Sequence, residues 1–438
     1  MLAIYFYLGP RRYVSVSLLF ALVTGFFQLV PTTLMVLPAV GVTKTYDWVL
    51  LFTGAMMLLK PQLFLDLRIW RSFKIMFLYG AVLTGLLLYS IFVKDVEVSV
   101  SVRVFRSLIY FLTIFLLVPL SQAELQKVFR LIVLITCLAC IPYCLQLVVN
   151  KTLLSKITSD DWGEDSETVS RYYNLPVYIY PALFFLFFDK KVFSIKYRWV
   201  LMFFASLSIL LSQHRNLLLA IVVCYFLYVV FKNGFKLQTF LLYSLLSVAL
   251  IFGADFMWGS RFSQGLNDIR QVSTEFSRIN LNEVTLSELT TTEFRQLLLI
   301  ERWHFILKND MSSLFGIGLV TDDSRAAAKL NFNVGMSDGY GNVAQIASGD
   351  IVWSVLLLQL GLVGTFAFVL FHVSLLAKFF SRRFDKYMQV GCLYVVCLLI
   401  TSFYSNTISL PYTTTLLMLF CAYFFNLTQN AFKNPEYE

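Results

Sequence analysis

The chain has 438 residues, of which 58% are hydrophobic and only 14% are charged, and its mean hydropathy is +0.73. A soluble domain carries roughly 25% charged residues, so this composition excludes an ordinary soluble protein and predicts an integral membrane protein. The net charge of +9 is compatible with an anionic partner, but no pattern points to nucleic acid, and the distribution of charge matters more than its sum.

Apolar segments follow one another along most of the chain. A helix needs about 20 apolar residues to cross the hydrocarbon layer of a membrane. On this measure the sequence predicts a polytopic all-α bundle of about twelve transmembrane helices, at residues 14–36, 46–60, 74–93, 103–120, 128–149, 173–188, 199–213, 216–231, 237–254, 351–377, 388–402 and 408–427. Pro31, Pro38, Lys44 and Asp47 blur the division between the first two, which leaves eleven spans as an alternative.

The charges of the connecting segments indicate their sidedness, because basic residues gather on the cytoplasmic side of membrane proteins. With the N-terminus inside, the cytoplasmic segments sum to +13 and the outer segments to −4. We therefore expect both termini in the cytoplasm. The chain then divides into N-terminal transmembrane helices (1–253, about nine spans), a large outer loop (254–350) and C-terminal transmembrane helices (351–438, about three spans).

A first outer loop, residues 150–172, carries an acidic run that is typical of a solvated face. It ends in Ser170-Arg171-Tyr172-Tyr173, which places Arg171 at the outer end of the next span. A second polar segment, Ser212-Gln213-His214-Arg215-Asn216, joins two spans with almost no loop. A charged group at a membrane boundary is costly, so Arg215 is either functional or a snorkelling residue at a helix end. His214 is a candidate base beside it.

The large outer loop has 97 residues, with eight Lys/Arg and twelve Asp/Glu. Its middle, residues 292–309, has the apolar spacing of an amphipathic helix, with Arg295 and Arg302 seven residues apart on one face. Planar guanidinium groups grip phosphate oxygens in pairs, so both arginines are candidate phosphate ligands, although each alone is as well explained by structure. His304 lies at the polar edge of this helix and is a second candidate base. Leu314-Phe315-Gly316-Ile317-Gly318 predicts a glycine turn.

Asp350 lies where the chain returns to the membrane. Partial desolvation there would raise the pKa of its carboxyl group and suit it to accept a proton from an attacking sugar hydroxyl. The alternative is a helix N-cap, a position that favours Asp, and the two roles are compatible. The sequence contains no zinc-spaced His/Cys set, no phosphate-cradling glycine loop and no nucleophile elbow, so we expect neither metal nor cofactor. All seven cysteines fall in predicted spans, where Cys137-x-x-Cys140 indicates packing rather than a disulfide or metal site.

Taken in order, three segments carry a resemblance. They are the turn Ser212-Gln213-His214-Arg215, the glycine turn after the loop helix, and the segment Asp350 to Gly364 with Leu360-Gly361-Leu362-Val363-Gly364. Over roughly residues 165–375 this arrangement resembles the O-antigen ligase/polymerase superfamily, which includes the Wzy-type polymerases of O-antigen, capsule and exopolysaccharide. The ligase branch carries a His, usually followed by Asn, before the span after the large loop. This chain has Ser348-Gly349-Asp350 there, which favours the polymerase branch.

The resemblance implies a metal-independent glycosyltransferase of the membrane-embedded class in a bacterial cytoplasmic (inner) membrane. Its substrates would be oligosaccharides linked to undecaprenyl diphosphate, and Arg171, Arg215, Arg295 and Arg302 would hold the diphosphate. Membrane lipids are expected partners, together with a chain-length regulator and a flippase. Two alternatives remain. One is an O-antigen ligase that transfers glycan to lipid A core, and the other is a polysaccharide transporter or flippase, against which the scarcity of charged residues within the spans weighs.

Overall fold

The computed structural model describes residues 2–38, 41–149, 151–155, 174–187, 197–212, 214–233, 291–308, 310–335, 343–346 and 351–433. Within these ranges the protein is helical and contains no β-strand, so the all-α prediction is confirmed for this part of the chain. The predicted span at 237–254, the loop residues 254–290, and the candidate residues Arg171 and Asp350 lie outside the described residues.

The first half of the chain contains α1 (Leu2–Leu8), α2 (Arg12–Val23), η1 (Thr32–Leu34), α3 (Asp47–Leu59), η3 (Pro61–Leu63), α4 (Leu67–Ser72), α5 (Lys74–Phe92), α6 (Val98–Leu108), η4 (Tyr110–Thr113), α7 (Ile114–Leu117), α8 (Gln122–Val149), α9 (Ile179–Phe187), α10 (Arg198–Leu211) and α11 (Arg215–Asn233). The second half contains α14 (Thr291–Leu307), α15 (Asp310–Phe315), η6 (Ala327–Lys329), α16 (Val352–Ser381), α17 (Lys386–Thr401), η7 (Thr407–Ser409) and α18 (Pro411–Lys433).

The described helices support a membrane protein, but they do not establish twelve spans. Three helical stretches are long and apolar enough to cross a membrane, namely Lys74–Phe92, Gln122–Gln146 and Val352–Ser381. Two bent pairs of helices raise the number to five if each pair is one span. The other predicted spans within the described residues coincide with helices of 9 to 23 residues that do not meet this length and hydropathy test together.

Breaks explain why several predicted spans are short. The span predicted at 14–36 is helical only to Val23, because Gly25, Phe26, Phe27 and Gln28 all have φ between +50° and +64° and reverse the hand of the backbone. The span predicted at 103–120 instead begins at Val98 and bends by 48° between α6 and η4. The chain also turns by 103° after α3, where Pro61 disfavours helical geometry at Lys60.

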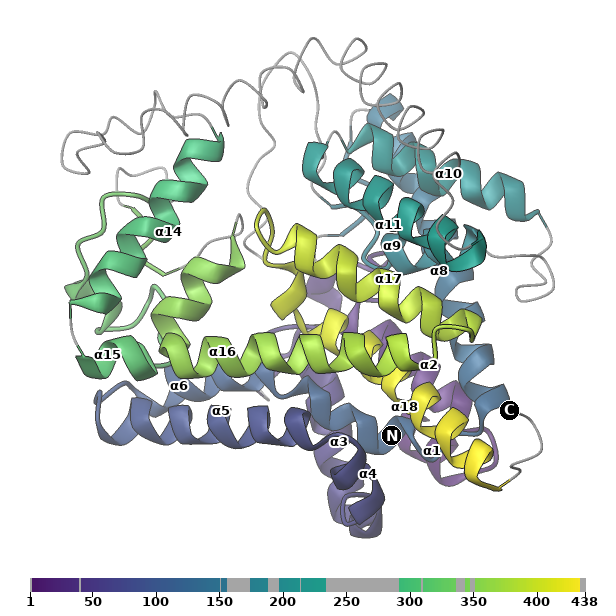
Figure 1. Cartoon of the computed structure of the whole chain (residues 1–438), viewed down its shortest axis with the longest axis horizontal. Coiled ribbons are helices and arrows are strands. Elements are labelled where there is room, and N and C mark those ends of the chain that lie inside the picture. The colour runs from purple at the N-terminus through teal and green to yellow at the C-terminus, as the bar shows by residue number, and fades with distance from the viewer. Residues whose placement is uncertain are drawn as a thin grey trace.

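Two ends of the molecule can be distinguished (Figure 1). We call one the loop end, where α14 and α15 lie beside the end of α5 and the bend of α16. We call the other the termini end, where α1, the start of α2 and the end of α18 meet the segment 116–120. There the Tyr7 hydroxyl donates to the Leu116 carbonyl (2.8 Å), and the Asn426 amide donates to the Leu120 carbonyl (2.6 Å).

A shared aromatic core connects the two ends. Helix α16, the longest among the described elements, packs along α5 and against α17, and the Tyr79 ring of α5 stacks on the Phe371 ring of α16 with 5.3 Å between centroids. All seven cysteines are buried and unbridged, and no group of three or more potential metal ligands exists within the described ranges.

Candidate functional site at the loop end

The predicted loop helix is present as α14 and lies across the start of α16. Its apolar face buries Leu297 and Leu298 in one cluster with Val334 of the loop and Ile351, the residue that follows Asp350. Ile351 is 4% exposed and occupies the N-cap position of α16, where it makes no side-chain capping bond. Asp350 itself lies outside the described residues, so both of its roles, as a base and as a helix cap, stay predictions.

Arg295 of α14 lies beside the connection between α17 and α18. Its guanidinium group stands over the Tyr404 ring at 5.6 Å from the centroid, within the range of a cation–π contact. Two residues earlier in that connection, the Ser402 hydroxyl accepts a hydrogen bond from the Trp353 indole N–H of α16 (3.1 Å). We call this meeting point of Arg295, Ile351, Trp353, Ser402 and Tyr404 the arginine corner.

Arg302 occupies a different environment on the same helix. The residue is 2% exposed, and its guanidinium group donates to the Glu301 carboxylate and to the carbonyls of Val334 and Gln345. Burial lowers the pKa of Arg302 to about 10, which still leaves it charged at neutral pH. Arg302 thus fastens α14 to the loop residues Val334 and Gln345. This geometry does not support the expectation that Arg302 binds substrate.

The two outer histidines differ in accessibility. His304 is exposed on α14, as its place on the polar edge of the helix predicted. His214 is half-buried, and its carbonyl accepts from the backbone N–H groups of Leu217 and Leu218 (both 3.1 Å), so it forms the entry turn of α11. Arg215 is the first residue of α11, but its side chain lies outside the described part of the structure.

The ends of the other two predicted site segments lie together. Leu175, four residues after Arg171, and Leu211, three residues before His214, pack against the same buried cluster of Ala139, Tyr143 and Leu154. This shared contact brings the end of α10 to Leu154 of the first outer loop.

A buried amide network holds this region. The Gln146 amide donates to the Asn174 amide oxygen (2.8 Å), and Asn174 donates to the Leu154 carbonyl (2.6 Å). Gln28, from the left-handed turn after α2, donates to the carbonyls of Ser155 (3.3 Å) and Asn174 (3.2 Å). The unusual turn therefore places a side chain that secures the ends of the first outer loop, which gives a reason for its backbone strain.

The connection between α17 and α18 reaches both regions. Tyr404 lies at the arginine corner, while the carbonyl of Tyr412 accepts a hydrogen bond from the Tyr178 hydroxyl beside α9 (3.1 Å). Segments that are more than 200 residues apart in the sequence are thus linked through this connection.

Two of the segments that carried the resemblance contact each other directly. Gly361 breaks α16 with φ +63° and ψ −167°, and a Cβ atom there would lie 2.3 Å from the backbone nitrogen of Gly316. In turn, a Cβ atom on Gly316 (φ +75°) would lie 2.5 Å from the Gln359 carbonyl oxygen. Ile317 N–H donates to the Leu358 carbonyl (2.8 Å) across this approach. We call this contact the glycine junction; it fixes the predicted glycine turn in the bend of α16.

Sequence reasoning missed a polar seam between α6 and the large loop. Arg103 pairs with Asp323 (2.6 Å), Glu97 pairs with Arg325 (3.7 Å), and the Lys94 ammonium donates to the Ser312 hydroxyl (3.1 Å). The start of α6 had been expected in an outer connection and Arg103 at the start of a span. Ser99, Arg103 and Arg106, spaced i, i+4 and i+7, share one face of a helix and were the signal that α6 has a polar side.

No protein-family model matches the chain, and no curated protein matches its sequence.

Proposed function

We propose that the protein is a polysaccharide repeat-unit polymerase of a bacterial cytoplasmic membrane, with its site at the loop end. It would transfer a growing glycan from undecaprenyl diphosphate to a hydroxyl of another lipid-linked repeat unit. In this proposal the protein spans the membrane about twelve times, with both termini in the cytoplasm, and belongs to the membrane-embedded glycosyltransferase class.

The observation that carries the proposal is the arginine corner. It brings Arg295, the residue after Asp350 and the α17–α18 connection to one place at the ends of apolar helices. Arg295 would supply a cation there, and Asp350, next to Ile351 in the sequence, would supply a carboxylate; glycosyl transfer from a diphosphate needs both groups. Two further groups of contacts support the proposal: segments 94–106 and 310–346 meet at the loop end, while segments 60–74 and 116–122 meet α18 at the termini end.

The chemistry would proceed by displacement at the anomeric carbon of the donor sugar. The acceptor hydroxyl forms the new carbon–oxygen bond, the bond to the lipid diphosphate breaks, and the hydroxyl proton passes to a base. Asp350 is the proposed base, with His214 and His304 as the other candidates. Arg295, with Arg171 and Arg215, would stabilise the charge that develops on the leaving diphosphate, which accelerates the reaction to the extent that it binds the transition state more tightly. Two lipid anchors would hold both substrates in one membrane plane and lower the entropic cost of their encounter.

The proposal is tested by replacing Arg295 with Ala in the producing bacterium and separating the surface glycan on a gel. We expect loss of the ladder with single repeat units still displayed, because losing one donor to a developing charge costs about 10²–10³ in rate. Arg325→Ala is the matched control: this arginine belongs to the same loop, but its side chain is 93% exposed at the seam with α6, and the ladder should persist.

Protein levels in the membrane must be equal for the comparison to hold. A normal ladder from the Arg295→Ala strain at the normal level would refute the diphosphate site. Product found on a lipid A core acceptor, with repeat length unchanged by the variant, would instead identify a ligase.

A further inference from the structure

The chain forms a protruding elbow after α3, made of residues 58–74. The turn of 103° separates α3 from η3 and α4, and Figure 1 shows the elbow projecting beside the start of α5. Its backbone is held locally, because the Trp70 indole donates to the Phe64 carbonyl (2.9 Å) and the Trp70 ring stacks on Phe77 (3.9 Å between centroids). The elbow is therefore an ordered part of the fold and not a loose connection.

Apolar and basic side chains share the surface of the elbow. Three leucines of the elbow are largely exposed and do not pack into the core: Leu58 is 86% exposed, Leu65 72% and Leu67 65%. The basic residues of the same segment are Lys60, Arg68, Arg71 and Lys74, against Asp66 alone as an acidic residue. Exposed leucines beside several cations and a tryptophan are typical of a segment that lies in the interface of a membrane with anionic lipids.

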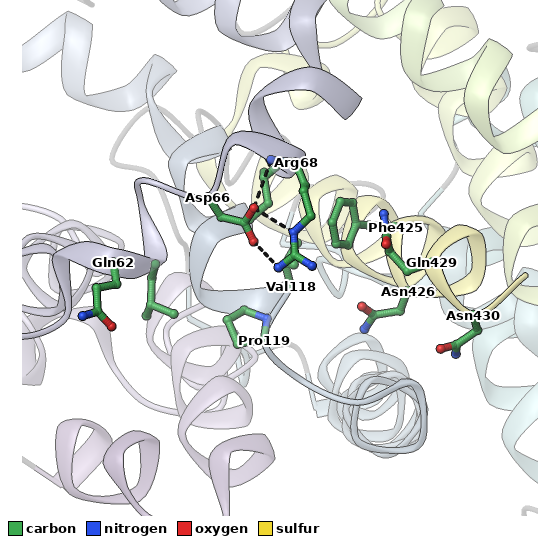
Figure 2. A pocket seen from close by; sticks show the side chains of 11 residues that line it. Gln62, Asp66, Arg68, Val118, Pro119, Phe425, Asn426, Gln429 and Asn430 are labelled. Carbon is green, nitrogen blue, oxygen red and sulfur yellow. Dashed lines mark hydrogen bonds and ion pairs between the residues drawn. The ribbon is translucent and has the colours of Figure 1, made fainter. Parts of the chain in front are cut away.

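A cavity of about 360 Å³ opens between the elbow, the segment after α7 and the end of α18. Figure 2 shows its polar lining, which is provided by Gln62, Asp66, Arg68, Asn426, Gln429 and Asn430. Leu63, Ile69 and Phe425 supply apolar wall. Carboxamides both donate and accept hydrogen bonds, so this lining suits a ligand with several hydroxyl or ester oxygens.

Arg68 is held in place by its neighbour. Its Nε donates to Oδ1 of Asp66 (3.0 Å) and its Nη2 to Oδ2 (2.7 Å), a two-pronged contact that fixes the plane of the guanidinium group. Nη1 takes no part in that contact, and Figure 2 shows the guanidinium group lying between Asp66 and Asn426. The group thus keeps one nitrogen for a ligand while Asp66 sets its orientation.

We propose that this cavity binds the headgroup of an anionic, hydroxyl-bearing phospholipid such as phosphatidylglycerol. The phosphate accepts from Nη1 of Arg68, the glycerol hydroxyls bind the carboxamides, and the acyl chains lie along the exposed leucines. Lys60 and Lys74 add positive charge around the cavity, which the anionic cytoplasmic leaflet attracts. Because the cavity is shared by the elbow, the 118–119 segment and α18, the lipid would also brace the termini end. The proposal concerns the end opposite to the arginine corner and does not depend on glycosyl transfer.

The test measures the thermal stability of the full-length protein, purified in a neutral detergent, after adding one ligand at a time. Phosphatidylglycerol should raise the melting temperature, whereas phosphatidylcholine and inorganic phosphate should not, because the site needs both the headgroup and the chains. Arg68→Gln should raise the half-saturating concentration of phosphatidylglycerol at least about tenfold, as expected for loss of a hydrogen bond to a charged group. The matched control is Arg71→Gln, a cation of the same elbow that does not line the cavity, and it should retain most of the affinity.

Gln429→Leu provides a second variant if Arg68→Gln reduces the yield of folded protein. It should lower affinity for phosphatidylglycerol more than affinity for phosphatidic acid, which has the phosphate but lacks the glycerol hydroxyls. The proposal would be overturned if phosphatidylcholine, or inorganic phosphate alone, raised the melting temperature as much as phosphatidylglycerol does. Identical affinities of the wild type and Arg68→Gln for phosphatidylglycerol would also overturn it.

Discussion

The loop end and the termini end are both rich in basic residues, but they use them differently. At the loop end Lys94, Arg103 and Arg302 each have partners within the protein, and Arg302 is almost completely buried. At the termini end Arg68 is fixed by a single carboxylate and borders an open cavity. The comparison teaches that a count of basic residues does not locate a ligand site. What matters is how many of their N–H donors are left after those that bond to other groups of the protein.

The two ends also differ in how they are fastened. The glycine junction brings two backbones into contact, so no side chain can be accommodated between them. At the termini end the links are side-chain hydrogen bonds such as Gln122 to the Tyr423 hydroxyl (2.9 Å). Side chains can adopt other rotamers and backbones in contact cannot, so substitutions should have their largest effects at the loop end.

The sharpest test of this difference is Gly361→Ala. The backbone angles at Gly361 are in a region that only glycine adopts readily, and the added Cβ would overlap the Gly316 nitrogen. We expect destabilisation of more than about 5 kcal/mol, beyond the usual range of single substitutions, and release of the loop from α16. Yield of folded protein and protease cleavage within residues 310–346 report this.

Gly85→Ala on α5 is the matched control, because open space surrounds that glycine and the helix favours alanine. It should be neutral or slightly stabilising. Normal protease resistance of the loop in the Gly361→Ala protein would show that the junction does not hold the loop.

A second prediction concerns the two classes of arginine within the large loop. Arg302→Met leaves the Glu301 carboxylate and two carbonyls without their buried donor, and should cost about 3 kcal/mol. Arg325→Met removes a partner at a 3.7 Å contact on the surface and should cost less than about 1 kcal/mol. Melting temperatures of the two purified variants give the comparison, and similar losses in both would contradict the structural role assigned to Arg302.

The sequence predicted the helices better than their bends. Apolar length and periodicity located α5, α14 and α17 to within two residues at each end, because burial along a regular helix leaves a regular pattern. The breaks at Gly361 and after Val23 were not predicted. Each depends on a partner distant in sequence, Gly316 in the first case and the amides of the first outer loop in the second.

The candidate site shows the same limit. Spacing predicted that Arg295 and Arg302 share a face of one helix, but it could not tell which would be covered by the returning chain. Which of the two arginines is covered depends on Val334 and Gln345, which lie more than 30 residues further along the chain. Arg103 went unrecognised because its partner, Asp323, is 220 residues away in the sequence.

The smallest effect is expected at the exposed pair of that seam. The Thr321 hydroxyl and the Arg103 guanidinium hold the pKa of Asp323 below its usual value. A carboxyl group with a lowered pKa in the folded state contributes its stability above the unfolded-state pKa, and loses it as the pH falls below about 4. Because both side chains are about half exposed, solvent screening limits the coupling between them to about 0–1 kcal/mol. A double-mutant cycle of Arg103→Gln and Asp323→Asn at pH 7 and pH 3 measures this coupling. A coupling as large as the effect of Arg302→Met, or one that grows in acid, would show that the seam fastens the loop as firmly as the buried arginine does.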